Sequence, residues 1–254
     1  MPAEDSFHFF EMTWQEAAER LRSARVALLP TGAVEAHGPH LPLGADVIIA
    51  RGTADAGARA LEAASVPAIV LPALPYAVTY VSSVFPGTVG ITPSALGAVV
   101  TDIGRSLARQ GIRTLCLCNA HLEPANVETL KRAAATVEWE AGIKADAIDL
   151  REERWAERLS EEFRRGARHA GAYETALLMA LRPDLVREEQ RRGLAPLWID
   201  LPARLREGAR TFREAGSELA YFGDPAAATR EEGERLLEAL GGIVRDCVLA
   251  MQAS

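Results

Sequence analysis

Cysteine is scarce in this chain. Three cysteines among 254 residues are too few for a disulfide framework. Cys116 and Cys118 stand two residues apart in TLCLCNA, a spacing that places both side chains on one face of an expected strand. A C-x-C metal site is the alternative, but we predict reduced cysteines of the hydrophobic core that have no separate function.

The chain also lacks the features of membrane, secreted and nucleic-acid-binding proteins. Its longest apolar runs are far shorter than the roughly 20 residues that a bilayer span needs. Residues 1–10, MPAEDSFHFF, carry acids where a signal peptide has basic residues. The 28 Lys and Arg residues are interspersed with 35 Asp and Glu residues, which gives a net charge of -7 and no basic patch. We therefore expect a cytoplasmic protein with no membrane or nucleic-acid partner.

The composition that is present is that of a globular domain. Hydrophobic residues make up 48% of the chain and charged residues 25%, and the length suffices for one domain with a sizeable core. The sequence contains no internal repeat, low-complexity tract or convincing linker. We therefore predict one domain that spans residues 1–254.

Short apolar segments alternate with amphipathic segments along the chain. Four apolar runs are predicted strands: RVALLP (25–30), AIVLPAL (68–74), RTLCLCNA (113–120) and KADAIDL (144–150). Helical patterns fall near residues 47–64, 93–110 and 124–141. This alternation predicts an α/β fold of three layers, α/β/α, around a mainly parallel central sheet.

Capping and breaking residues support these boundaries. Thr92-Pro93 is a helix start, and Gly111 is the expected stop of the same helix. Thr229 and Glu232 have the spacing of a capping box before a C-terminal helix. Residues 191–226 contain several glycines and prolines and are predicted to form an extended excursion.

Two polar clusters come directly after predicted strands. TGAVEAHG follows the first strand and NAHLEP follows the third. Because ligands of open α/β sheets bind beyond the carboxyl ends of the strands, both clusters belong at one edge of the sheet. In extended backbone Glu35 and His37 face one side, and His121 and Glu123 repeat the pattern in reverse. We expect these four side chains to converge.

Asp46 adds a fifth donor near this point. Two imidazoles and three carboxylates suit two divalent cations about 3.5–4 Å apart, with one carboxylate shared between them. Asp46, the unpaired group, is the natural bridge. The mixed nitrogen and oxygen donors favour zinc, and manganese also suits the hard oxygen donors.

Structural roles are the alternative for each of these residues, because histidines at strand ends often only form hydrogen bonds and loop acids are usually solvated. However, four of the five histidines lie in three short polar motifs beside carboxylates, which favours a metal site. His40, within the first motif, is predicted to brace the loop.

The third motif is His169 with Glu174, in ARHAGAYETALLMAL. His169 precedes a predicted helix, and near neutral pH its imidazole can exchange protons with a metal-bound water as a general acid or base. The alternative is a helix cap without chemistry. Glu174 would orient the imidazole or support the metal ligands, or it is an acid favoured by the helix dipole.

These motifs resemble the creatininase family of metal-dependent amidohydrolases. Residues 35–46 agree with the family pattern Glu-x-His-Gly-Pro-His-Leu-Pro-Leu-Gly-x-Asp at every specified position. FPGT (85–88) resembles the substrate-side loop, residues 102–123 resemble the second metal motif with its helix and strand, and residues 169–186 resemble the third motif. The resemblance covers roughly residues 20–190.

The resemblance implies a binuclear site and a reaction. Glu35 and His121 would bind one metal, His37 and Glu123 the other, and Asp46 would bridge them. A water between the metals would attack the carbonyl of a small, often cyclic, amide, and His169 would carry the proton to the leaving nitrogen. We count His169, Glu123 and Glu174 as candidate catalytic residues. Relatives tend to form hexamers that are built from dimers, so we expect a homo-oligomer.

The substrate walls depart from those of creatininases proper. Leu122 replaces a tyrosine, Val81-Ser82 stand where relatives have Glu-His, and EEFRRGARH replaces an aromatic wall before the third histidine. We therefore expect a small-molecule substrate other than creatinine. The candidate substrate-binding residues are Leu122, Ser82, Arg165 and Arg168. If the arginines face the cavity, the substrate carries a carboxylate or phosphate; the alternative is a solvated helix end.

Two other functions fit the same residues. One is a deformylase-like or peptidase-like hydrolase that acts on a nucleotide precursor or a modified peptide. The other is a metal-binding or ligand-binding protein without catalysis. The presence of all five predicted ligands together with His169 favours an enzyme.

Overall fold

The computed structural model describes residues 7–253. At its centre lies a four-stranded sheet in the order β2-β1-β3-β4, and every neighbouring pair of strands is parallel. The strands are β1 (Val26–Thr31), β2 (Ala68–Val70), β3 (Thr114–Asn119) and β4 (Lys144–Ala147). The predicted parallel sheet is confirmed. Strand β2 ends earlier than predicted, close to Pro72, which has no N–H group for a ladder.

The longer helices agree closely with the amphipathic patterns. The α-helices are α1 (Trp14–Arg20), α2 (Ala45–Ala63), α3 (Pro93–Arg109), α4 (Pro124–Ala141), α5 (Glu153–Ala156), α6 (Glu161–Arg164), α7 (Ala172–Leu181), α8 (Glu188–Arg192), α9 (Leu201–Arg206) and α10 (Arg230–Ala253). Short 3-10 helices lie at η1 (Phe9–Glu11), η2 (Pro183–Leu185) and η3 (Pro225–Ala227).

The predicted helix boundaries have visible causes. Thr92 caps α3 by accepting a hydrogen bond from the N–H of Ala95, at 3.2 Å. After α3 the chain turns at Gly111, whose φ is +92°. At the start of α10 the hydroxyl of Thr229 accepts from the N–H of Glu232, at 3.2 Å.

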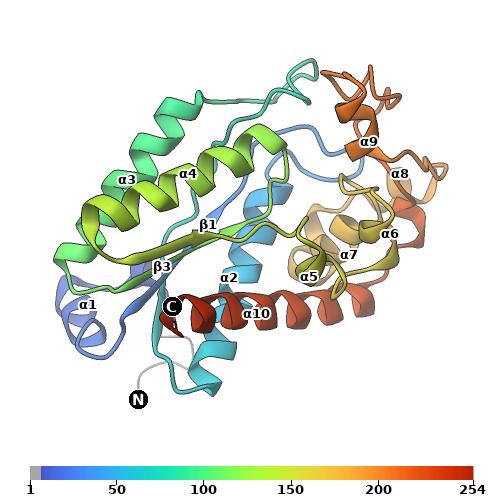
Figure 1. The fold of residues 1–254 in the computed structure, drawn as a ribbon. Coiled ribbons are helices and arrows are strands. Elements are labelled where there is room, and N and C mark those ends of the chain that lie inside the picture. The colour runs from blue at the N-terminus through green and yellow to red at the C-terminus, as the bar shows by residue number, and fades with distance from the viewer. Residues whose placement is uncertain (1–6, 254) are drawn as a thin grey trace.

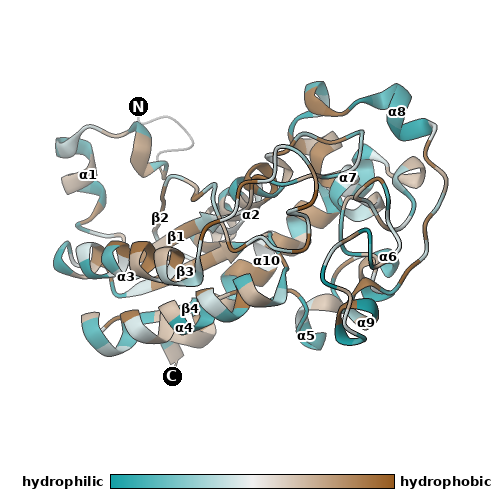
Figure 2. Ribbon diagram, turned by 90° about the horizontal axis from the view of Figure 1, so that it is seen from above, coloured by the Kyte–Doolittle hydropathy of each residue, from teal (hydrophilic) through white to brown (hydrophobic). Residues whose placement is uncertain are grey.

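Helices cover both faces of the sheet (Figure 1). Because side chains alternate along a strand, Val26 and Leu28 pack against α2 and α10, whereas Ala27 and Leu29 pack against α3 and α4. Figure 2 shows the central strands as predominantly hydrophobic. The predicted three-layer α/β/α architecture is confirmed.

The cysteines lie in the core, as predicted. Cys116 and Cys118 are buried on the α2 and α10 side of the sheet and carry free thiols. Among residues 7–253, no helix has the length and apolar character that a membrane crossing requires.

The excursion predicted at residues 191–226 folds beyond the carboxyl ends of the strands. It contains α9 and packs against the segments around residues 81 and 167 through a small apolar cluster: Val81, Ala167, Leu201, Phe212, Ala215, Ala220 and Phe222. Two backbone hydrogen bonds between Leu197 and Gly223, of 2.8 and 2.7 Å, join its two ends. The excursion is therefore an ordered wall beside the carboxyl edge of the sheet.

Candidate active site

Side chains from two strand ends meet at one point. Strands β1 and β3 pair in a register that sets Thr31 opposite Asn119, so the loops that follow them leave the sheet side by side. Glu35, His37 and His121 come from these loops, and Asp46 comes from the first turn of α2. All four are at most 4% exposed. The predicted convergence of the two motifs is therefore present.

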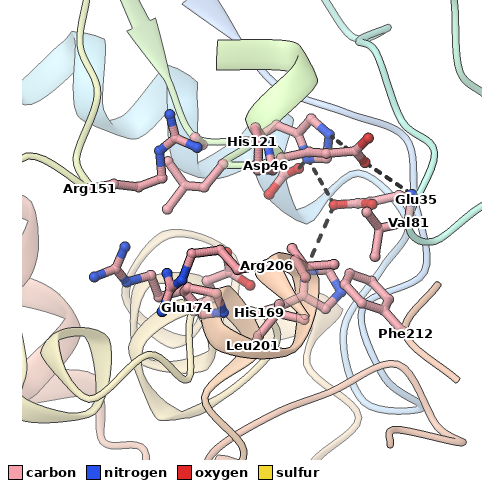
Figure 3. Close-up of a pocket in the computed structure, with 17 residues that line it drawn as sticks. Glu35, Asp46, Val81, His121, Arg151, His169, Glu174, Leu201, Arg206 and Phe212 are labelled. Carbon is pink, nitrogen blue, oxygen red and sulfur yellow. Dashed lines mark hydrogen bonds and ion pairs between the residues drawn. The ribbon is translucent and has the colours of Figure 1, made fainter. Parts of the chain in front are cut away.

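Asp46 stands between two groups of donor atoms. Its Oδ2 is 3.1 Å from Nδ1 of His121, which is also 3.0 Å from Oε1 of Glu35. Its Oδ1 is 3.2 Å from Nε2 of His37, which lies 3.7 Å from Oε2 of Glu174. Two sets of three potential ligands thus share Asp46: Glu35, Asp46 and His121; and His37, Asp46 and Glu174. Figure 3 shows Asp46, His121 and Glu35 grouped at one side of the pocket.

The chemistry of these donors fits metal ions. Glu35, Asp46 and Glu174 are buried, and in the described part of the chain they form ion pairs only with histidines. Oδ2 of Asp46 is buried without a hydrogen bond. Burying three carboxylates with no permanent cation is costly, and divalent ions would supply the missing charge.

The backbone orients both histidines toward the carboxylates. Nε2 of His121 donates to the carbonyl of Val78, at 3.0 Å, which leaves Nδ1 to face Glu35 and Asp46. Nδ1 of His37 donates to the carbonyl of Glu35, at 3.1 Å, which leaves Nε2 to face Asp46. Hydrogen bonds of this kind set the tautomer and the ring plane of metal-binding histidines.

The ionisation of the cluster reflects its surplus of carboxylates. Burial disfavours a charged His37, but the carboxylates of Asp46 and Glu174 outweigh this and raise its pKa to about 10. Burial, followed by repulsion from Asp46, raises the pKa of Glu174 to about 8. Protons thus balance the carboxylates here, and a bound cation would displace protons as it enters.

His169 lies at the turn before α7, beside this cluster. Its Nε2 donates to the carbonyl of Ala36, at 2.8 Å, and its Nδ1 is 3.8 Å from Oε1 of Glu35. Its ring stacks between His37 and Phe212, with centroid distances of 4.4 and 4.2 Å. Burial, together with the nearby charge of His37, lowers its pKa to about 4. The imidazole is therefore neutral at pH 7, and the lone pair of Nδ1 can accept a proton.

Helix α7 is tied to the first motif by His40. This buried histidine forms a 2.9 Å hydrogen bond between its Nε2 and the hydroxyl of Thr175. Its main chain also accepts a hydrogen bond from the N–H of Arg187, at 2.8 Å. The bracing role predicted for His40 is present in these contacts, and they help to hold α7, and thus Glu174, near Asp46.

A residue that the sequence analysis missed, Glu162, holds the turn that carries His169. Its buried carboxylate accepts hydrogen bonds from the N–H groups of Tyr173, at 2.9 Å, and Asp224, at 2.7 Å. Gly171 and Gly223 pass so close to it that a side chain at either position would collide with the carboxylate. No local signal marks Glu162, since it stands in EEFRR among other acids.

Glu162→Gln should weaken this turn. The amide has only one acceptor oxygen, so its NH₂ group would face a backbone N–H donor. We expect the free energy of unfolding to fall by about 1–3 kcal/mol and kcat to fall as His169 loses its fixed position. Chemical denaturation and steady-state kinetics measure both effects. Glu161→Gln, on the exposed neighbouring residue, is the matched control and should change stability by less than about 0.5 kcal/mol; equal behaviour of the two variants would contradict this role.

A cavity of about 660 Å³ opens over the donor cluster. Of the four predicted substrate-binding residues, Leu122 and Arg168 line it. Ser82 is buried behind the cavity wall, where its hydroxyl donates to Oε2 of Glu35. Arg165 is exposed and stacks on Trp198, at 4.5 Å from the ring centroid. The structure thus separates the two arginines that the sequence had placed together.

Glu123 also lines the cavity, but its carboxylate is turned toward the loop after β2. It accepts hydrogen bonds from the N–H groups of Tyr80, at 2.9 Å, and Val81, at 3.1 Å. Its Oε2 lies 3.9 Å from Nε2 of His121. In this conformation Glu174 takes the place beside His37 that the resemblance gave to Glu123, and a ligand role for Glu123 stays a prediction.

Other lining residues come from segments for which the sequence predicted no role in the site. They are Arg151, after β4, and Leu201, Pro202, Leu205, Arg206 and Phe212 from the excursion. Their positions depend on how the excursion folds over the sheet edge. A motif in the local sequence could not reveal them.

A comparison of the sequence with known protein families identifies the family of this chain. The sequence model of the family described as "Creatininase: Creatinine amidohydrolase" matches residues 10–247. The chain belongs to the creatininase family. The resemblance stated from the motifs is thereby confirmed.

Relatives within the creatininase family carry two different names. The chain is 34% identical over 228 residues to a mycofactocin precursor peptide peptidase of Mycobacterium tuberculosis, covering 87% of this chain and 82% of the relative. It is 32% identical over 195 residues to a creatinine amidohydrolase of Pseudomonas putida, covering 69% and 72%. A crystal structure of creatinine amidohydrolase superposes with a TM-score of 0.73 at 29% identity, covering 95% of this chain and 96% of that one.

Proposed function

We propose that this chain is a metal-dependent hydrolase that cleaves the carbon–nitrogen bond of an amide at a site for two divalent cations. The observation that carries the proposal is the pair of buried donor sets that share Asp46 below an open cavity. Membership of the creatininase family supports the reaction class. The neutral imidazole of His169 beside the donors supports catalysis over binding alone.

The donor sets suggest how the cations would be held. Glu35, Asp46 and His121 would bind one cation, and His37, Asp46 and Glu174 would bind the other. Zinc suits the mixed imidazole and carboxylate donors, and manganese suits the carboxylates. Two solved creatininases with TM-scores of 0.70 are described, one as "Creatininase Mn" and the other as a mutant of "Zn-Zn type", which supports both metals as candidates.

The chain's own residues complete the mechanism. When bound, the two cations would lower the pKa of a water molecule and polarise the substrate carbonyl. Nδ1 of His169 would take a proton and deliver it to the leaving nitrogen, because Nε2 is held by Ala36. Phe212 covers one face of this imidazole and would exclude water from it. Ser82 would keep Glu35 oriented.

Two substrate classes are candidates. The first is a small-molecule amide other than creatinine, because Leu122 lines the cavity where creatininases proper have tyrosine. The second is a short or modified peptide, favoured by the peptidase name of the mycobacterial relative. A cavity of about 660 Å³ lies within the range of about 300–1,000 Å³ for sites of drug-sized ligands and accommodates either class.

A substrate panel tests the proposed reaction. Protein stripped of metal would be reloaded with zinc or manganese and assayed against cyclic amides, formamides and short peptides. We expect hydrolysis of one class only, and only in the loaded protein. Tight metal binding without hydrolysis of any of them would instead support the non-catalytic alternative. The homo-oligomer implied by the family resemblance, a hexamer, is also a proposal, and light scattering would measure it.

Metal content provides a separate prediction. We expect about two metals per chain in the wild-type protein, and about one in Glu174→Gln because the set with His37 and Asp46 loses an oxygen. Chelation should lower the Tm of the wild-type protein, because metal ions that bind only the native state stabilise that state. Elemental analysis and calorimetry measure these quantities. Glu123→Gln is the companion variant, and its metal content tests the ligand role predicted for Glu123; two metals in Glu174→Gln would remove Glu174 from the site.

A further inference from the structure

The cavity has a second chemical feature besides the metal donors. Three arginines, Arg151, Arg168 and Arg206, line it, and Figure 3 shows Arg151 across the pocket from Glu35. We propose that these arginines form a subsite for a carboxylate, so that the substrate is an amide that bears a free carboxylate, such as the carboxyl-terminal end of a short peptide. This inference rests on the proposed function, since it assumes that an amide is cleaved in the same cavity.

Arg168 is held in position with unused donors. Its Nε donates to the carbonyl of Phe163, at 2.9 Å, and its guanidinium stacks on the ring of Phe163, at 4.8 Å from the centroid. Within residues 7–253 its terminal Nη groups form no hydrogen bond or ion pair. Burial, followed by repulsion from Arg151, lowers the pKa of Arg168. A fixed guanidinium with two free Nη groups is suited to bidentate contact with a carboxylate.

Arg206 lies at the end of α9 and is exposed. It also forms no ion pair among the described residues, whereas Arg204 on the same short helix pairs with Glu207, at 3.0 Å. Arg206 is thus available to a ligand at the rim of the cavity. Because its side chain is exposed, its substitution should not destabilise the fold.

The arginines at this end of the cavity differ in whether their charge is already paired. Arg151 is neutralised by Asp149 through hydrogen bonds of 2.8 and 2.9 Å. Arg151 and Arg206 repel the charge of Arg168, and Asp149 and Asp200 attract it. Arg168 and Arg206 form no ion pair among the described residues, so their guanidinium groups are available to an anion. A carboxylate can be held by the fork of Arg168 alone, whereas a phosphate monoester carries about 1.5–2 negative charges at neutral pH and would draw on both arginines.

The remaining wall is apolar. Leu122, Leu201, Leu205 and Phe212 line the same cavity, and they would contact the hydrocarbon part of the ligand. The metal donors, the apolar wall and the arginines together describe an amphipathic substrate: an amide to be cleaved, an apolar body and an anionic group.

A matched pair of peptides tests the subsite. N-acetyl-alanyl-leucine with a free carboxyl terminus, and the same peptide as its carboxamide, would be titrated calorimetrically into the zinc-loaded protein. We expect the free acid to bind about tenfold more tightly, because hydrogen bonds to a charged group are stronger than those to a neutral one. Arg168→Gln should remove this preference, because it should weaken the binding of the free acid and leave that of the carboxamide unchanged. Arg206→Gln should reduce it, and Arg165→Gln, outside the cavity, should retain it.

The outcomes separate the subsite from the reaction. Equal binding of acid and amide, or no binding of either, overturns the proposal. A preference for the acid that survives Arg168→Gln also overturns it, because the carboxylate would then bind groups other than Arg168. Tighter, Arg168-dependent binding of phenyl phosphate than of the acid would assign the site to phosphate instead. An Arg168-dependent preference for the acid without hydrolysis of any substrate would support the subsite and contradict the proposed function. Hydrolysis without that preference would support the proposed function and contradict the subsite.

Discussion

Asp46→Asn should abolish hydrolysis and leave at most about one metal per chain. The shape of the side chain is kept, but the carboxylate that faces both His37 and His121 becomes a neutral amide with one oxygen. Both donor sets lose a ligand at once. Because a pair of metal ions supplies several kcal/mol of transition-state stabilisation, kcat should fall by about 10³-fold or more. Elemental analysis and steady-state kinetics on the same preparation measure the two losses.

Asp102→Asn is the control for this experiment. Asp102 is exposed on α3 and does not line the cavity, and among residues 7–253 its carboxylate accepts only from Arg105. It should retain the metals and the rate of the wild-type protein. Circular dichroism of both variants shows whether the fold persists. Full metal retention in Asp46→Asn would leave Asp46 without a bridging role.

His169→Gln should reduce kcat by about 10²- to 10⁴-fold, the usual contribution of a general acid or base. The glutamine amide can still donate to the carbonyl of Ala36, but it cannot take up or release a proton as Nδ1 does. We expect both metals to remain, since neither of the two sets that share Asp46 includes His169. Single-turnover kinetics, combined with elemental analysis, measures the chemical step apart from metal binding.

A different result would assign His169 another role. Its Nδ1 lies near Oε1 of Glu35, and His169 forms a third potential donor set with Glu35 and His37. Loss of one metal from His169→Gln would show that His169 is a metal ligand. An unchanged kcat would show that its role is structural. His40→Gln is a useful comparison, because His40 is also buried in the first motif but its side chain bonds to Thr175 and belongs to none of the three potential donor sets.

The parts of the fold that the sequence predicted are those with local causes. The bounds of α3 follow from Thr92-Pro93 and Gly111, and the four strands follow from short apolar runs. The meeting of Glu35 with His121 could also be predicted, because adjacent parallel strands deliver their following loops to one edge. The register of β1 with β3 brings this about.

The remaining features depend on tertiary packing. Glu174 reaches His37 only because α7 packs against α2 and α10, and no periodicity in its own sequence indicates that contact. The orientation of Glu123 depends on the backbone of Tyr80 and Val81, more than 40 residues earlier in the chain. Arg206 reaches the cavity through the path of the excursion, which has few regular elements. Long-range contacts of this kind leave no short pattern in the sequence.

The candidate metal donors and much of the apolar wall come from different parts of the structure. Glu35, His37 and His121 follow buried strands, whereas much of the wall belongs to the excursion, which is stabilised by the apolar cluster around Phe212 and Phe222. Mutation of Leu201, Leu205 or Arg206 can therefore change which ligand is recognised while Glu35, His37 and His121 keep their positions. Relatives can therefore differ in substrate selectivity without a change in the donor groups. Exchange of residues 191–226 between relatives would be a direct way to alter that selectivity.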